Sequence, residues 1–442
     1  MFANKKTEPQ ADAGGEVVTL PARPSLVETP SPEEYLKVLP ADHKAYTDKY
    51  FLRTNEILKA EGLNPVVRAQ LFIRKGPGEF HGINETVAML KKYSNFFENG
   101  GKVFALPEGT QYQAKETLVV LEGHVQDLIE LETMYLGAIS SQTTKANEPV
   151  TCVNTTQVAC RMKEIVTAAG GRPVTYFGAR HWHYSEDEAI NAAAKLGMAS
   201  GSSTDVGAAL WGKAGEGTIP HALENIYAWK YGKEVAVAEA TKAFDRQIDP
   251  AVRRIALIDY NNREIDDSIA TAQALGENLY AVRVDTCGEN IAQGALTGPN
   301  DPNRGKYFSA DLPLPAADAP EAKYWYGNGV TVTGVLALRQ SLDAAGYENV
   351  KMFLTSGFGS VNKVKAFVEA EKVLGVKLFD ALGVGGVYSP VRTTTMDIVA
   401  VGDTAETMQP ISKVGRPYRP NARLQEVKDP FVLEELPAAS GF

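Results

Sequence analysis

The second half of the chain alternates short apolar runs with stretches of helical periodicity. Five runs have the composition and length of β-strands: residues 173–180, 254–260, 279–286, 350–357 and 377–386. Between them, apolar side chains repeat along one helical face, most clearly over 263–275 and 360–374. Strands that are apolar on both faces and alternate with amphipathic helices are typical of parallel βα units. The pattern therefore predicts an α/β fold, either a barrel or a doubly wound sheet.

The residues before this alternation predict a smaller α+β domain. A helix is expected over 47–63, where Tyr50 and Phe51 belong to an apolar face, and a longer helix over 126–144. Short strands are expected at 66–73, 102–106 and 117–121.

Changes in composition divide the chain into four parts. The first residues are rich in Pro, Ala, Glu and Thr, which predicts a flexible lead-in. Near the other end, residues 413–421 are interpreted as a return strand and loop that pack elsewhere. The expected parts are a lead-in, 1–39; an N-terminal α+β domain, 40–150; an α/β barrel domain that carries the candidate site, 151–400; and a C-terminal segment, 401–442.

Polar and glycine residues gather where the five expected strands end. In order along the chain they are Arg180, Asp259, Arg283 with Asp285, Ser356 with Gly357, and Gly383 with Gly385 and Gly386. A βα barrel assembles its active site from these strand ends. A doubly wound sheet concentrates its ligand groups at one switch point, and no G-x-G-x-x-G follows a first strand. The distribution therefore favours a barrel.

Composition narrows the range of functions. The 442 residues are 44% hydrophobic and 22% charged, which is typical of a globular chain with room for two or three domains. A net charge of -9 argues against a nucleic-acid or membrane surface, but leaves room for one cationic pocket that binds phosphate. Three cysteines form no disulfide framework, and the opening residues lack the apolar core of a signal peptide. We therefore expect a cytoplasmic protein.

Two glycine loops are the first chemical signal. SGFGS, which contains Ser356, Gly357 and Gly359, and GVGG, which contains Gly383, Gly385 and Gly386, each follow an apolar strand. Glycine lets backbone N–H groups approach a phosphate, and a helix N-terminus adds a favourable dipole. A tight turn would explain either loop alone. Two such loops on consecutive strands favour a phosphate cradle.

Charged residues and histidines at the other strand ends are less specific. His221 follows a glycine turn and a proline in GTIPH, which holds it on a stiff loop. Asp259, Arg283 and Asp285 can bind a ribose diol, hydrated Mg²⁺ or a phosphate, or form a buried ion pair that closes the barrel mouth. His181 and His183 have the spacing of metal ligands, but no third ligand is recognisable, so we favour structural roles. No metal ligand is assigned from these patterns.

Together these segments resemble the nicotinate phosphoribosyltransferases, especially their archaeal-type branch. The motifs in chain order are FGARHWH, GMASGSSTDVG, GTIPHAL, RVDT, SGFGS and GVGG. TDKYFLRTNEILKAEGLNP and LPEGT near the N-terminus and KVGRPYRPN near the C-terminus are similar as well, so the resemblance spans about residues 46–422.

The resemblance implies a fold and a reaction. The fold would be an irregular, seven-stranded parallel α/β barrel beside an α+β domain built from N-terminal and C-terminal segments, in a homodimer or dimer-based oligomer with shared active sites. The reaction would join nicotinate to 5-phosphoribosyl 1-diphosphate in NAD biosynthesis, with Mg²⁺ as cofactor. ATP would act as a co-substrate through phosphorylation of His221.

The resemblance also implies roles for individual residues. Tyr50 of the partner subunit and Phe177 would sandwich the pyridine ring. Arg180 and Arg283 would bind phosphate or carboxylate, Asp259 and Asp285 the ribose or the metal, and the glycine loops the 5-phosphate. Ser203 lies in the turn where nicotinamide-using relatives carry Asp, which favours the acid because a hydroxyl donates to a carboxylate.

Three alternatives stay open at this point. The chain could be a related enzyme that uses nicotinamide or quinolinate, or a non-catalytic relative that binds a nucleotide. A phosphate-binding barrel isomerase or aldolase would explain the glycine loops, but it leaves His221 and Tyr50 without a role and predicts an essential Lys or Glu that we cannot place.

Overall fold

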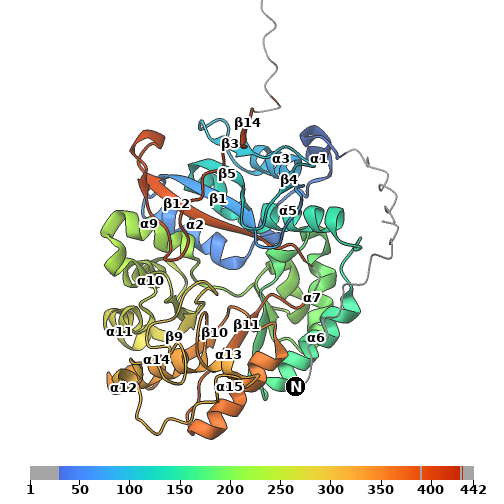
Figure 1. Cartoon of the computed structure of the whole chain (residues 1–442). Helices are drawn as coiled ribbons and strands as arrows, with labels where there is room; N and C mark the ends of the chain where they lie inside the picture. The colour runs from blue at the N-terminus through green and yellow to red at the C-terminus, as the bar shows by residue number, and fades with distance from the viewer. Residues whose placement is uncertain (1–28, 389–390, 429–430, 432–442) are drawn as a thin grey trace, which may run out of the picture.

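The computed structural model describes residues 29–388, 391–428 and 431 (Figure 1). Most of the expected lead-in, residues 1–28, lies outside the described residues. The rest of it forms helix α1 (Pro32–Val38), which begins with a capping box in which Ser31 Oγ accepts a hydrogen bond from the Glu34 N–H at 3.3 Å. The chain is therefore helical several residues before the expected start of the N-terminal domain.

An antiparallel sheet forms the core of the N-terminal domain. Its strand order is β13 (Gln409–Pro410), β12 (Thr394–Gly402), β1 (Val66–Ile73), β5 (Thr117–His124), β3 (Lys102–Ala105) and β14 (Gln425–Val427). Helices α2 (Lys49–Ala60), α3 (Ile83–Tyr93) and α5 (Glu132–Asn147) pack with it. The sheet is thus built from both ends of the chain, as the expected fold class requires.

The C-terminal strands differ from the expected ones. Residues 413–421 form a loop, while the strands lie on either side of it, in β12 to β13 and in β14. Strand β12 pairs with β1 along its length, from Thr394 opposite Ile73 to Gly402 opposite Val66. The boundary expected at residue 400 falls inside this strand.

A parallel sheet forms the second domain. Its order is β7 (Gly201–Ser202), β6 (Val174–Tyr176), β11 (Ala381–Val384), β10 (Lys351–Leu354), β9 (Leu279–Val284) and β8 (Arg254–Leu257). Helices α6 (Thr155–Ala168), α7 (Asp187–Leu196), α10 (Ala236–Gln247), α11 (Glu264–Leu275), α14 (Val332–Ala344) and α15 (Val361–Leu374) belong to the same domain. All five strands expected from the apolar runs are present, and the parallel α/β prediction is confirmed.

The parallel sheet is curled but does not close as a seven-stranded barrel. Within the described part of the chain, its edge strands β7 and β8 do not pair with each other. The segment 215–220 lies between them instead: the Glu216 N–H donates to Ser202 O of β7 at 2.8 Å, and Thr218 Oγ1 donates to Ile255 O of β8 at 2.7 Å. This segment carries the GTIPH motif and leads directly into helix α9 (His221–Tyr231). The motif therefore occupies the position where a closing strand is expected.

The two domains meet where the parallel strands end. Helix α5 packs closely on the 3-10 helix η3 (Ala179–His181), and a Cβ atom added to Gly137 of α5 would lie 2.3 Å from the Trp182 carbonyl oxygen. On the other side, the Lys49 N–H donates to Ser203 O at 2.8 Å. The contact leaves no room for a side chain at Gly137.

Among the described residues, no helix combines the length and apolar character that a membrane span needs.

Replacing Gly137 by Ala tests the closeness of this contact. The added methyl group must displace the Trp182 carbonyl, which we expect to lower the free energy of unfolding by about 1–3 kcal/mol. Gly305→Ala is the matched control, because a Cβ atom there meets nothing within 4 Å. Denaturant unfolding measures both variants, and equal stability of the two would contradict the close contact.

Candidate active site

A cavity of about 510 Å³ lies at the carboxyl ends of the parallel strands. Most of the residues singled out from the sequence line it: Phe177, Arg180, His221, Arg283, Asp285, Ser356, Gly357, Gly359, Gly383, Gly385 and Gly386. A smaller compartment of about 70 Å³ adjoins it and is lined by Tyr50, with Arg180, His221, Arg283 and Asp285 shared between the two. Asp259 and Ser203 line neither space. The fold thus brings most of the candidate residues into one site.

The two glycine loops touch each other at one side of the cavity. A Cβ atom on Gly359 would lie 2.2 Å from Gly386 O, and one on Gly383 would lie 2.5 Å from Phe177 Cδ2. Ser356 has a φ of 61°, a conformation that residues other than glycine rarely adopt. Only glycines allow this packing, so the loops are more than ordinary tight turns.

His181 holds the second loop in place. Its Nδ1–H donates to the Gly385 carbonyl at 3.1 Å. Burial, together with the nearby charge of Arg180, lowers the pKa of His181 to about 4, so the ring is neutral at neutral pH. His183 points to a different partner, Glu85 of α3, with its Nε2 at 3.0 Å from Oε1. The two histidines of RHWH therefore hold separate parts of the structure.

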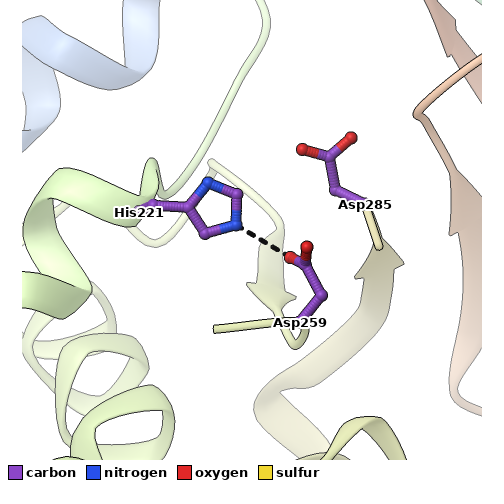
Figure 2. Close-up of side chains that lie close together, drawn as sticks. All are labelled: His221, Asp259 and Asp285. Atoms are coloured by element: carbon purple, nitrogen blue, oxygen red, sulfur yellow. Dashed lines mark hydrogen bonds and ion pairs between the residues drawn. The ribbon is translucent and has the colours of Figure 1, made fainter. Parts of the chain in front are cut away.

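A buried chain of three side chains lies beside the cavity. Lys413, from the C-terminal loop, forms a close ion pair with Oδ2 of Asp259, whose Oδ1 accepts a hydrogen bond from His221 Nε2 at 2.8 Å (Figure 2). Asp259 is 1% exposed and follows β8, while His221 is the first residue of α9. Asp259 does not itself border the cavity, but its hydrogen bond orients His221, which does.

These contacts set the protonation states of the three groups. Burial favours a neutral Asp259, but the charge of Lys413 and the hydrogen bond from His221 outweigh it, so the pKa of Asp259 lies below its ordinary value. Burial also opposes the charge of Lys413, yet the carboxylates of Asp259 and Asp285 raise its pKa. Burial and the positive charge of Lys413 lower the pKa of His221, and together they outweigh the Asp259 carboxylate, which raises it. At neutral pH, Lys413 is therefore an ammonium, Asp259 a carboxylate and His221 a neutral imidazole.

His221, Asp259 and Asp285 are also a candidate metal group. One ligand atom from each lies within 4.8 Å of the others, and Figure 2 shows both carboxylates on the same side of the imidazole. Both oxygens of Asp259 already have partners, in His221 and Lys413. Asp285 has one oxygen bonded to Thr355 Oγ1 at 2.6 Å and borders the cavity. The residues fit a hydrated Mg²⁺ that Asp285 and a phosphorylated substrate would hold, since Mg²⁺ takes few carboxylates and keeps water.

Positive charge at the cavity is greater than the sequence indicated. The cationic side chains that line it are Arg74, Arg180, Arg283, Lys413 and Arg416. Only Arg180 and Arg283 were expected. Lys413 and Arg416 belong to KVGRPYRPN, so the resemblance of this segment was the signal that could have found them. The cavity suits a ligand with several negative charges.

The aromatic pair differs from the expected arrangement. Tyr50 reaches the smaller compartment from the same chain, whereas the resemblance implied Tyr50 of the partner subunit. A Cβ atom on Gly217 of the GTIPH turn would lie 3.0 Å from Tyr50 Cδ1, so the turn packs closely on this ring. Tyr50 and Phe177 make no ring contact with each other in the described structure, where Tyr50 instead contacts Phe51. The Tyr50 ring borders the smaller compartment, and the Phe177 ring borders the adjoining larger cavity.

Ser203 lies away from the cavity, contrary to its expected role in recognising the pyridine base. It is 1% exposed, and its hydroxyl has no hydrogen-bond partner in the described structure. Its backbone is held between the two domains: the Ser203 N–H donates to Tyr176 O at 3.2 Å, and its carbonyl accepts from the Lys49 N–H at 2.8 Å. Sequence reasoning could place the turn but could not orient this hydroxyl.

Glu132 is a site residue that the sequence did not indicate. It lines the smaller compartment, is 4% exposed and lies 3.6 Å from Arg180 Nη1. Burial raises the pKa of Glu132 to about 8, although Arg180 opposes this rise. A carboxyl group that is neutral at pH 7 can donate a hydrogen bond to an anion. Its position was hidden because helix α5 is buried on most of its faces and mixes polar with apolar residues, so the sequence shows no single apolar face from which to place Glu132.

Comparison with known proteins agrees with this geometry. Residues 48–143 match the profile of the quinolinate phosphoribosyl transferase N-terminal domain. Two nicotinate phosphoribosyltransferases of Mycobacterium tuberculosis, pncB1 and pncB2, are 26% identical over 196 residues and 31% identical over 190 residues. The alignments cover 44% and 42% of this chain, and only 40% and 36% of the length of those relatives.

Solved structures extend the comparison to most of the chain. Nicotinate phosphoribosyltransferases from Porphyromonas gingivalis and Vibrio cholerae share the fold, with TM-scores of 0.57 and 0.55 at 12% identity each. Each match covers 84% of this chain, and 94% and 87% of the two structures. The chain therefore shares the fold of these nicotinate phosphoribosyltransferases. The profile and the curated relatives are phosphoribosyltransferases as well, each matched over less than half of the chain.

The raised pKa of Glu132 predicts a pH-dependent stability. A carboxyl whose folded pKa exceeds its unfolded value destabilises the fold as pH rises between the two, here from about 4.5 to about 8. Glu132→Gln removes this loss, so the variant should gain roughly 2–5 kcal/mol relative to the wild type between pH 5 and pH 9. Urea unfolding at both pH values measures the gain. The exposed Glu348→Gln is the control, and a difference that does not change with pH would refute the prediction.

Proposed function

We propose that this protein is a nicotinate phosphoribosyltransferase that forms nicotinate mononucleotide and pyrophosphate from nicotinate and 5-phosphoribosyl 1-diphosphate, a step of NAD biosynthesis. The observation that carries the proposal is the cavity itself, which combines two glycine loops, five cationic side chains and the Asp285 carboxylate. A substrate with a phosphate at one end and a diphosphate at the other matches these features. The similarity to nicotinate phosphoribosyltransferases supports the same conclusion.

The proposed chemistry rests on charge. The pyridine nitrogen forms a bond with the anomeric carbon while the bond from that carbon to the diphosphate oxygen breaks, which builds positive charge on the ribose and negative charge on the leaving group. The cationic side chains would stabilise the leaving diphosphate, and the Asp285 carboxylate, which lines the same cavity, would stabilise the ribose as it becomes cationic. Mg²⁺, when bound through Asp285, would neutralise diphosphate oxygens. The glycine loops would hold the 5-phosphate.

Recognition of nicotinate is proposed to depend on Arg180 and Glu132. A guanidinium binds a carboxylate with two parallel hydrogen bonds, and a protonated carboxyl group can donate a third. Both side chains border the compartment that Tyr50 lines, so the pyridine ring would lie against Tyr50. This assignment replaces the role first given to Ser203.

ATP is proposed to act through His221. Because its Nε2–H donates to Asp259, the neutral ring carries its lone pair on Nδ1, for which no partner is found in the described structure. Attack of Nδ1 on the γ-phosphorus would form a nitrogen–phosphorus bond and release ADP. His221 begins helix α9, where the dipole favours a phosphate group.

A homodimer and a cytoplasmic location stay proposals that the resemblance and the composition support. Cys152, Cys160 and Cys287 are all free thiols, in keeping with a reducing compartment.

The activity is tested by incubating the protein with phosphoribosyl diphosphate, Mg²⁺ and one of three bases: nicotinate, nicotinamide or quinolinate. We expect mononucleotide from nicotinate at a rate at least about 100-fold above the other bases, because buried unpaired polar groups penalise the wrong ligand. Chromatography with and without ATP measures the product. Tight binding without any product would favour a non-catalytic relative, and a preference for another base would move the assignment within the family.

The role of His221 is tested with ATP that carries a labelled γ-phosphate. The wild type should acquire an acid-labile, base-stable label, and ATP should stimulate product formation. His221→Ala should lose both the label and the stimulation, since it lacks the nucleophilic nitrogen. His124→Ala, which does not line the cavity, is the control. An ATP response that survives in His221→Ala would reject the phosphohistidine.

A further inference from the structure

Lys363 is a buried cation that the proposed reaction leaves unused. It lies in the first turn of α15, is 9% exposed and does not line the cavity. Its ammonium donates to the Ser356 carbonyl at 3.0 Å and lies 4.5 Å from the centre of the Phe358 ring. The side chain thus reaches the first glycine loop from behind.

This position is electrostatically unfavourable in the absence of an anion. A helix N-terminus carries positive partial charge, so a cation in the first turn is repelled rather than attracted. Burial lowers the pKa of Lys363 to about 8, and within the described part of the chain the opposing charge comes from Asp285. An anion bound on the other side of the loop would supply the missing compensation.

The backbone of the loop is arranged to accept such an anion. The N–H groups of Gly357, Phe358 and Gly359 have no hydrogen-bond acceptor among the described residues, and successive free N–H groups form a concave anion site. In a trans peptide the C=O and N–H point in opposite directions. Because the Ser356 carbonyl points at Lys363, behind the loop, the Gly357 N–H points away from it, towards the cavity that Gly357 lines.

We propose that Lys363 is a positioning residue of the phosphate cradle: its ammonium fixes the Ser356–Gly357 peptide with the N–H towards the cavity and makes the loop selective for a phosphate monoester dianion. Without it, the peptide can rotate and present a carbonyl oxygen, which repels phosphate. Ser356 keeps its left-handed conformation with help from a second bond, from its hydroxyl to Thr286 O at 3.0 Å. The inference rests on the proposed function only in taking the 5-phosphate of the sugar as the natural ligand.

The test uses ribose 5-phosphate as the probe and measures binding by calorimetry, which does not require turnover. Lys363→Met keeps the length of the side chain and removes its charge and donors. We expect it to weaken ribose 5-phosphate binding at least about tenfold, the scale of one charge-assisted hydrogen bond, while nicotinate binding stays within about twofold. Lys363→Arg should restore most of the affinity. Lys365→Met, an exposed lysine on the same helix, is the control.

A pH profile separates this role from a purely structural one. From about pH 7 to 9.5, wild-type affinity for ribose 5-phosphate should fall more steeply than that of Lys363→Arg, because only the wild type loses the positive charge at this position. Glu132, whose pKa is raised to about 8, ionises over the same range in both proteins, so the difference between the two profiles is the measure. The cavity arginines and Lys413, whose pKa is raised, keep their charge through most of this range, and His221 is neutral throughout it. This comparison holds even where Lys363→Met does not fold.

The outcomes distinguish the inference from the proposed function. Unchanged ribose 5-phosphate binding in Lys363→Met, an equal loss of nicotinate binding, or identical pH profiles for wild type and Lys363→Arg would overturn the role of Lys363. Absence of ribose 5-phosphate binding in the wild type would overturn it as well. Lys363-dependent binding in a wild type that forms no mononucleotide would support the cradle and refute the activity.

Discussion

The buried ion pair between Asp259 and Lys413 is the contact on which the rest of the site depends. It joins the end of β8 in the parallel sheet to the C-terminal loop, and it orients His221 through the second carboxylate oxygen. Two charges removed from water cost several kcal/mol each, and only a matched partner offsets that cost. Neither residue can therefore be lost alone. The pair fixes the C-terminal loop, and with it Arg416, at the mouth of the cavity.

The distribution of charge in the site follows from the same principle. The chain as a whole is acidic, with a net charge of -9, yet its cationic side chains converge on one cavity. Buried carboxyl groups nearby respond in two ways. Asp259, beside an ammonium, ionises more readily than usual, whereas burial raises the pKa of Glu132 and of Asp397. The site therefore keeps a surplus of positive charge that a polyanionic ligand can neutralise.

The parallel strands and the residues at their ends could be predicted from sequence because buried strands are continuous apolar runs and their carboxyl ends meet at one edge. This reasoning places Arg180, Arg283, Asp285 and both glycine loops at one edge of the sheet. It does not orient side chains, and neither it nor the resemblance could show that the buried Ser203 borders neither the cavity nor the smaller compartment.

Long-range contacts explain the other differences. Strand β12 depends on pairing with β1, far away in sequence, and segment 215–220 spans the open side of the sheet through only two hydrogen bonds to the flanking strands. Lys363 and Glu132 looked like ordinary helical residues because only their buried neighbours give them a role. Local patterns carry no signal for such contacts.

The strand order of the antiparallel sheet has a consequence for the synthesis of the protein. β1 lies between β5 and β12, and β12 follows the entire parallel domain in the chain. While the ribosome is still making that domain, the nascent N-terminal sheet has an unpaired, apolar edge at β1, which is a site for non-native pairing between chains. The parallel domain can fold first, but the lining of the cavity cannot be complete until residues 413–416 have been synthesised, since Lys413 and Arg416 belong to it. Assembly of the cavity thus depends on a segment that follows the whole parallel domain in the chain.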